Sequence, residues 1–204
     1  NTTSLVLPGY SLTYRDKDSE LNINNGTYLQ MLTQIGREGY GSDIDFAKAV
    51  VEATLIRTFN NVHRITIRGE AGVIKTNSFD EVPTSLRFYA GGDKSVRGFD
   101  YREISPTAEV IDPETGELIV DSIGGKYLAT SSVEYAYQVA DNWRVAAFVD
   151  AGTATNDTST TLTYSVGPGV HWLSPIGPVR LYVARGFAPD ENTWQLHILL
   201  GPEL

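Results

Sequence analysis

A single arginine in a glycine-rich loop has the clearest chemical task in this chain. Arg97 lies within residues 88–101, between Val96 and the pair Gly98 and Phe99, and aromatic residues stand at both ends of the stretch. Apolar side chains in a loop need burial, and glycine permits the tight corners that let a loop fold back. A guanidinium buried with such a loop needs an anionic partner. We therefore predict ion pairing, not catalysis, for Arg97.

Two carboxylates are candidate partners for this arginine. Glu134 and Asp150 lie in two successive stretches of alternating polar and apolar residues, each on the polar side of its stretch. A planar guanidinium can bind two carboxylates through its fixed fork of N–H donors. The sequence thus predicts a cluster of Arg97, Glu134 and Asp150.

The other candidates for catalysis or metal binding are weak. His63, His171 and His197 fall on separate predicted strands with no carboxylate at ligand spacing, so lumen or interface positions are favoured over metal ligation. Lys94 and Ser95 lack the flanking pattern of a phosphate-binding P-loop. We expect no enzyme, no cofactor and no metal site.

Alternation of polar and apolar residues runs through most of the chain and predicts β-strands. In the last such run Trp194, Leu196, Ile198 and Leu200 share one face. About nine strands are expected, over residues 5–15, 27–36, 45–58, 62–74, 126–138, 143–151, 161–172, 178–185 and 193–200. The predicted fold class is therefore all-β and antiparallel.

The two faces of these strands differ in charge, and this favours a transmembrane β-barrel. One face carries almost no charge, whereas the other has both signs, which suits a wet lumen. The residues of the charged face are Lys48, Glu52, Arg64, Arg68, Glu70, Glu134, Arg144, Asp150 and, after an expected slip of parity near Ala184, Arg185. Short and long connections alternate, and aromatic residues gather near strand ends, as in outer-membrane barrels. A water-soluble β-sandwich has the same alternation and stays open as the alternative.

Composition narrows the possible partners. The chain has 204 residues, a formal net charge of −9 and no cysteine. The acidic balance argues against nucleic-acid binding, which needs clustered lysine and arginine. No run of residues approaches the length of an apolar helical span. The first residues lack the basic and apolar segments of a signal peptide, so none is expected within the chain.

The longest connection covers residues 75–125 and is predicted to be a loop inserted into the barrel lumen. Loops of this length are usually functional or disordered. Its apolar residues include Leu86, Phe88 and Tyr101, which argues against disorder because they need a cavity to fill.

Several motifs resemble the outer-membrane assembly superfamily that includes BamA and TamA. The carrying stretches are residues 88–101, with the Val-Arg-Gly-Phe motif at 96–99, and 132–135, 148–152, 167–181 and 200–204. The last of these resembles the TamA branch. The similarity spans essentially the whole chain.

This resemblance implies a fold, a site and a function. The expected fold is the C-terminal portion of a sixteen-stranded barrel, residues 1–204, whose sixth loop places Val96, Arg97, Gly98 and Phe99 in the lumen against Glu134 and Asp150. The implied function is assembly or translocation in the bacterial outer membrane, helping autotransporter-type proteins insert by strand pairing at a lateral seam near Gly201 and Pro202. Implied partners are membrane lipids, nascent clients and an inner-membrane-anchored TamB-like protein.

Two further expectations accompany this interpretation. A polypeptide-secreting pore of the two-partner type is the alternative function, since lumen charges could line a path. An odd number of strands brings the first and last strands together in parallel, so ordinary antiparallel closure should fail. The unpaired edges then make self-association possible.

Overall fold

The computed structural model describes residues 3–111, 116–157, 162–189 and 192–204. Within these ranges one antiparallel sheet has the strand order β1-β2-β3-β4-β7-β8-β9-β10-β11, and a separate two-stranded sheet pairs β5 with β6. The sheet strands are β1 (Gly9–Lys17), β2 (Gly26–Gly36), β3 (Phe46–Phe59), β4 (His63–Thr76), β7 (Tyr127–Ala140), β8 (Trp143–Thr155), β9 (Thr163–Ser174), β10 (Gly177–Phe187) and β11 (Asn192–Leu200). The minor elements are β5 (Thr107–Ile111), β6 (Leu118–Ser122) and the 3-10 turn η1 (Thr84–Leu86). No helix in the described ranges is long and apolar enough to cross a membrane.

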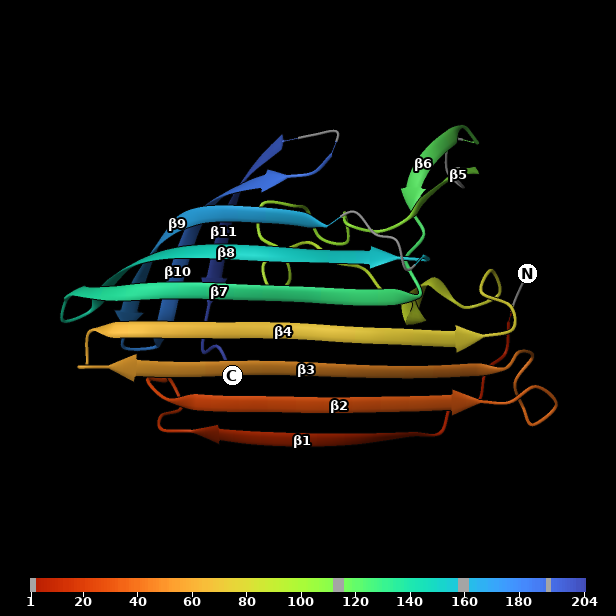
Figure 1. Cartoon of the computed structure of the whole chain (residues 1–204), viewed down its shortest axis with the longest axis horizontal. Helices are drawn as coiled ribbons and strands as arrows, with labels where there is room; N and C mark the ends of the chain where they lie inside the picture. The colour runs from red at the N-terminus through yellow and green to blue at the C-terminus, as the bar shows by residue number, and fades with distance from the viewer. Residues whose placement is uncertain (1–2, 112–115, 158–161, 190–191) are drawn as a thin grey trace.

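The sheet is a curved wall, as Figure 1 shows, with β10 and β11 curling behind the plane of β1 to β9. Each strand pairs antiparallel with its neighbours. The all-β prediction and the nine expected strands are confirmed, with ends that differ by a few residues. Residue 161, the expected start of one strand, lies outside the described residues.

Side chains alternate across this wall as predicted. Apolar residues of the outer face are exposed, including Val133, Val149 and Trp172, whereas Arg64 and Asp150 of the inner face are buried. One prediction is wrong. No slip occurs near Ala184, because β10 pairs continuously with β11 through this region.

Arg185 therefore lies on the outer face instead of the lumen side. It is paired in register with Trp194, and its guanidinium lies 5.4 Å from that indole ring and 5.1 Å from the ring of Phe187. Stacking on aromatic faces gives the charge a favourable contact on a largely apolar surface. The next residue, Gly186, faces inward, whereas the expected slip would have placed Arg185 on that face.

The connection from β4 to β7 contains structure that the sequence did not reveal. Figure 1 shows the hairpin of β5 and β6 standing apart from the main sheet. Its residues Ile111, Leu118 and Val120 are each 70% exposed. Of the described residues in this connection, several up to Ile104 pack in the apolar cluster on the inner face, and Gly125 near its end pairs with Phe88.

Both edges of the sheet are open. Within the described residues β1 pairs only with β2, and β11 pairs only with β10. This agrees with the expectation that nine strands do not close on themselves. An unpaired edge presents a row of backbone N–H and C=O groups to any strand that can reach it.

Candidate functional site

The loop tip, residues 88–101, is held at its base by two short bridges. Phe88 pairs with Gly125, and Ala90 pairs with Ile104. Phe88 and Ala90 are buried in an apolar cluster against the inner face of the wall. The loop tip is thus fixed at its base before it reaches the residues of the motif.

Arg97 lies at the centre of the site and is 1% exposed. Its Nε and Nη2 donate to the two carboxylate oxygens of Asp150 at 2.8 and 2.9 Å, and its own backbone N–H donates to the same carboxylate at 3.0 Å. Nη1 donates to Glu134 at 2.6 Å, and Nη2 also donates to Ser132 Oγ at 3.1 Å. The structure thus brings together the three residues that the sequence analysis grouped.

The strand register explains why these partners converge. Ser132 of β7 stands opposite Asp150 of β8, and Glu134 stands opposite Phe148. All four side chains point inward, because residues two apart in a strand share a face. Two adjacent pairs of one hairpin therefore supply the described hydrogen-bond acceptors of the guanidinium.

Two aromatic rings complete the environment of the guanidinium. Its central carbon lies 3.6 Å from the ring centre of Phe148 and 4.5 Å from that of Tyr182. Burial alone would lower the pKa of Arg97, but the hydrogen bond and charge of Asp150 and the charge of Glu134 outweigh it and hold the pKa above its ordinary value. Arg97 stays charged, so the cluster is a permanent ion pair and not a proton donor or acceptor.

Glycines on the inner face make room for this arrangement. A Cβ on Gly169 would lie 2.3 Å from the ring of Tyr182, and one on Gly167 would lie 2.9 Å from the ring of Phe148. Gly98 has a φ of +92°, and a Cβ there would lie 2.9 Å from the backbone nitrogen of Gly186. The loop backbone and the β10 backbone therefore touch directly at a point where both residues are glycine.

The two apolar residues of the motif are also buried. Val96 is fully buried, and a Cβ on Gly152 would lie 2.7 Å from its side chain. Phe99 is also buried and fills the space beside Gly186. Every residue of the Val-Arg-Gly-Phe motif thus has a contact that depends on its type.

Several contacting residues were missed by the sequence analysis. Ser132, Phe148 and Tyr182 touch Arg97 directly. Phe148 and Tyr182 each stood on the charged side of a predicted strand, and a large aromatic in that position was a usable signal. His171 was predicted at a lumen or interface position, and it is buried beside Tyr182, with its Nε2 2.9 Å from the tyrosine hydroxyl.

The expected seam residues lie just beyond the last strand. β11 ends at Leu200, as predicted, and Gly201 has a φ of +95°. The Gly201 N–H still donates to the carbonyl of Pro178 at 2.9 Å. Pro202 follows, and because proline has no N–H it cannot extend the ladder. The chain therefore leaves the sheet at these two residues.

After the seam the chain turns into the interior of the wall. The carboxylate of Glu203 accepts hydrogen bonds from Arg64 of β4 and from Arg180 of β10, the latter at 2.7 Å. Figure 1 places this end of the chain behind β3 and β4. The end of the chain thus joins the two arms of the curved sheet, a contact that the sequence analysis did not predict.

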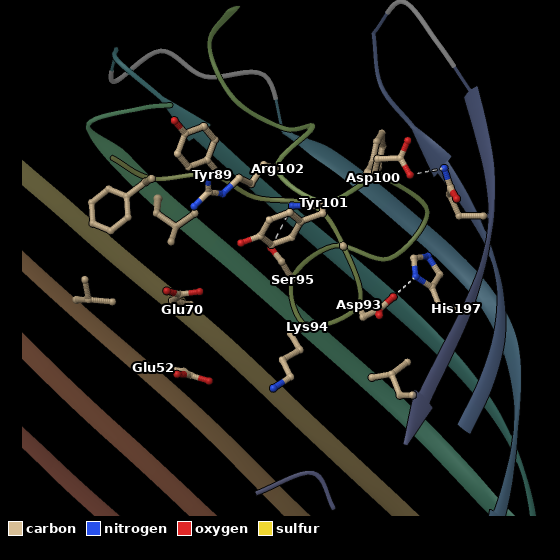
Figure 2. Close-up of a pocket in the computed structure, with 18 of the residues that line it drawn as sticks. Glu52, Glu70, Tyr89, Asp93, Lys94, Ser95, Asp100, Tyr101, Arg102 and His197 are labelled. Atoms are coloured by element: carbon tan, nitrogen blue, oxygen red, sulfur yellow. Dashed lines mark hydrogen bonds and ion pairs between the residues drawn. The ribbon is translucent and has the colours of Figure 1, made fainter. Parts of the chain in front are cut away.

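A cavity of about 980 Å³ lies beside the loop tip. Its wall on one side includes Glu52 and Glu70, which are direct partners across β3 and β4. Figure 2 shows Lys94 of the loop tip pointing into this space from the other side. Residues of β11, among them His197, complete the lining. The inner face is therefore polar, with both signs of charge.

The chain is similar to known proteins over nearly its whole length. Residues 1–201 match the model of the Omp85 superfamily domain. The outer membrane protein assembly factor BamA of Nitratidesulfovibrio vulgaris is 34% identical over 86% of this chain and 22% of its own length. BamA of Neisseria meningitidis serogroup B is 29% identical over 79% of this chain and 24% of its own length. The chain thus spans about a quarter or less of these relatives.

A solved structure has the same fold. The crystal structure of BamA from Haemophilus ducreyi lacking POTRA domains 1–3 superposes with a TM-score of 0.77, over 95% of this chain and 41% of that chain, at 20% sequence identity. At this identity the similarity concerns the fold alone.

Proposed function

This chain belongs to the Omp85 superfamily, and from that premise we propose that it helps client proteins insert into the outer membrane by pairing their strands with the open edge of β11. It is part of an outer-membrane β-barrel, as its relatives are. The relatives are named as assembly factors, which fits a role without bond-breaking chemistry.

The observation that carries the proposal is that, among the described strands, β11 pairs on one side only and lies beside an anchored loop. On the outer face of that strand Trp194, Leu196 and Ile198 are exposed and apolar. A client strand that pairs there satisfies its backbone groups by β-augmentation and places its own apolar face in lipid. Strand pairing and lipid burial together supply the driving force.

Leaving the sheet at Gly201 and Pro202 limits how far β11 can pair. A short ladder costs less to open than a full one, because each missing N–H removes a hydrogen bond from the edge. These two residues are thus proposed to weaken the seam, and Arg97 with Glu134 and Asp150 to hold the loop tip steady beside it.

The identity of the clients is a finer proposal. The resemblance of residues 200–204 to the TamA branch supports autotransporter-type clients and an inner-membrane-anchored TamB-like partner. Insertion by the whole protein of an autotransporter barrel, compared with a barrel of another class, tests this. A preference for the autotransporter barrel supports the proposal, whereas equal rates count against it.

A polypeptide-secreting pore of the two-partner type is the second candidate. The cavity beside the loop tip favours it, because walls bearing Glu52, Glu70 and Lys94 could line a path for an unfolded chain. Single-channel recording separates the two functions. A secretion pore should show stable conductance that rises when the loop tip is deleted, whereas an assembly factor should lose client insertion on that deletion.

The main experiment uses the absence of native cysteine. A single cysteine at Leu196 of β11 should form a disulfide with a cysteine in the terminal strand of a client arrested during insertion. The matched control is a cysteine at Val133, which is also on the outer face but in the central strand β7. Equal crosslinking at both positions would contradict strand pairing at the β11 edge.

The membrane position of the outer face gives a separate prediction. Val133→Arg should lower the free energy of unfolding by about 2–4 kcal/mol, whereas Val139→Arg, near the end of the same strand, should cost about 0–1 kcal/mol. Urea titration of the protein in lipid vesicles measures both. Similar costs at the two positions would show that this face does not span the bilayer.

A further inference from the structure

The loop tip also contacts the inner face of β11, the edge strand. The backbone N–H of Gly98 donates to Nε2 of His197 at 2.8 Å, and the hydroxyl of Thr193 donates to the carbonyl of the same glycine. The side-chain amide of Gln195 donates to Asp100 at 3.0 Å. These three β11 residues are two apart and share the inner face. We refer to Thr193, Gln195 and His197 with their loop partners as the β11 contact.

The ring of His197 is oriented by a second partner. Nδ1 bonds to the carboxylate of Asp93, also in the loop tip, and Figure 2 shows this bond across the space between loop and strand. Because Nε2 accepts from Gly98, the ring proton is assigned to Nδ1, which donates to Asp93. One side chain of β11 therefore holds two separate points of the loop tip.

The loop tip is held much more firmly on its other side. Towards β7 and β8 it is anchored by Arg97, whose charged hydrogen bonds to Asp150 and Glu134 are buried. Towards β11 the bonds of Gln195 and His197 also reach carboxylates, but these carboxylates, Asp100 and Asp93, are exposed. Thr193 donates to a backbone carbonyl. Water and salt screen bonds to exposed charges much more than they screen a buried ion pair. When the two sides are pulled apart, the β11 contact should break first.

We propose that the β11 contact is a releasable restraint on the edge strand, and that it must open before a client strand can pair there. His197 is then a positioning residue, which sets where β11 lies relative to the loop tip through Gly98 and Asp93. The loop tip stays seated on β7 and β8 while β11 moves. This inference rests on the proposed function and adds the residues that control the seam.

A reversible crosslink tests the inference in this cysteine-free chain. The whole protein carrying Asp100→Cys and Gln195→Cys is treated in lipid vesicles with a bis-methanethiosulfonate reagent, which bridges the two thiols through disulfides. Client insertion should fall to the level of vesicles without the protein. A reductant, which removes the bridge, should restore it.

The control is Glu52→Cys with Glu70→Cys, treated with the same reagent. These residues also face the cavity, but they lie opposite each other on β3 and β4, which are already paired. Bridging them should leave insertion unchanged. Normal insertion with the β11 contact bridged would overturn the inference and leave the proposed function intact. Absence of insertion by the unaltered protein in the same vesicles would instead remove the proposed function.

A second variant decides the matter if the cysteine pair itself disables insertion. Thr193→Val keeps the shape of the side chain but removes the hydroxyl that donates to Gly98. If the restraint must open, this variant should insert clients at least as fast as the unaltered protein. The distribution of distances between spin labels on the loop tip and on β11 should shift to longer values and become broader. Loss of insertion in this variant would show that the contact must stay closed, which contradicts the inference.

Discussion

Replacing Arg97 by alanine should lower the free energy of unfolding by about 3–5 kcal/mol and abolish client insertion, because breaking a buried ion pair leaves uncompensated charge. The substitution strands the carboxylates of Glu134 and Asp150, which lie buried in the wall with no other arginine within hydrogen-bond reach among their described contacts. Urea titration in lipid vesicles measures the stability, and heat-modifiable migration in detergent reports whether the barrel remains folded.

Arg102→Ala is the matched control for this experiment. Arg102 follows the loop tip directly, but it is exposed, and its described contacts are stacking on Tyr89 and Tyr101. Its removal should change the free energy of unfolding by less than about 1 kcal/mol, as expected for an exposed cation over an aromatic ring. If the two variants had equal stability and both supported normal insertion, the role assigned to Arg97 would be wrong.

The two acids should not be equivalent. Asp150→Asn should cost about 3–5 kcal/mol, since Asp150 carries two of the guanidinium bonds and also accepts the backbone N–H of Arg97. Glu134→Gln should cost about 1.5–3 kcal/mol, the usual range for one hydrogen bond to a charged group, because Glu134 accepts a single bond from Arg97. Both amides nearly preserve the shape of the acid they replace.

The same urea titration gives the order of the two costs. A larger loss in Glu134→Gln than in Asp150→Asn would contradict the assignment of Asp150 as the principal partner. Both variants are measured in the whole protein in vesicles, so that the barrel has all of its strands.

The sequence predicted the wall and the centre of the site for a physical reason. Alternation with a period of two fixes which side chains face inward, and it therefore placed Glu134 and Asp150 on one side without any coordinates. Arg97 then had to find an anion, because a buried guanidinium without one is costly. The resemblance of the loop motif to the superfamily supported the same pairing of Arg97 with the two acids.

The remaining features depend on contacts that no local pattern encodes. His197 meets Gly98 across 99 positions of sequence, and the end of the chain meets Arg64 across 139. Such contacts are set by how the curved sheet brings β11 and β4 around the loop. The hairpin of β5 and β6 was missed because each strand has only 5 residues and none of them is buried, so the sequence carries little burial signal there.

Arg185 shows a different error. The general expectation that charged residues face the lumen was preferred to the local alternation of the strand. An arginine was assumed to face the lumen, and a parity slip was introduced to bring it there. The continuous register of β10 with β11 and the rings of Trp194 and Phe187 show that an aromatic neighbourhood can hold a cation on the outer face. Unbroken alternation was the better guide.

The most direct measurement is the coupling free energy between Arg97 and Asp150. Urea titration of the unaltered protein, Arg97→Ala, Asp150→Ala and the double variant in lipid vesicles yields it from four free energies of unfolding. If this pair anchors the loop tip in the wall, the double variant should be destabilised by clearly less than the sum of the two single variants, with a coupling of about 2–3 kcal/mol. Losses that simply add would mean that the two side chains do not interact in the folded protein, and the anchored loop would have to be abandoned.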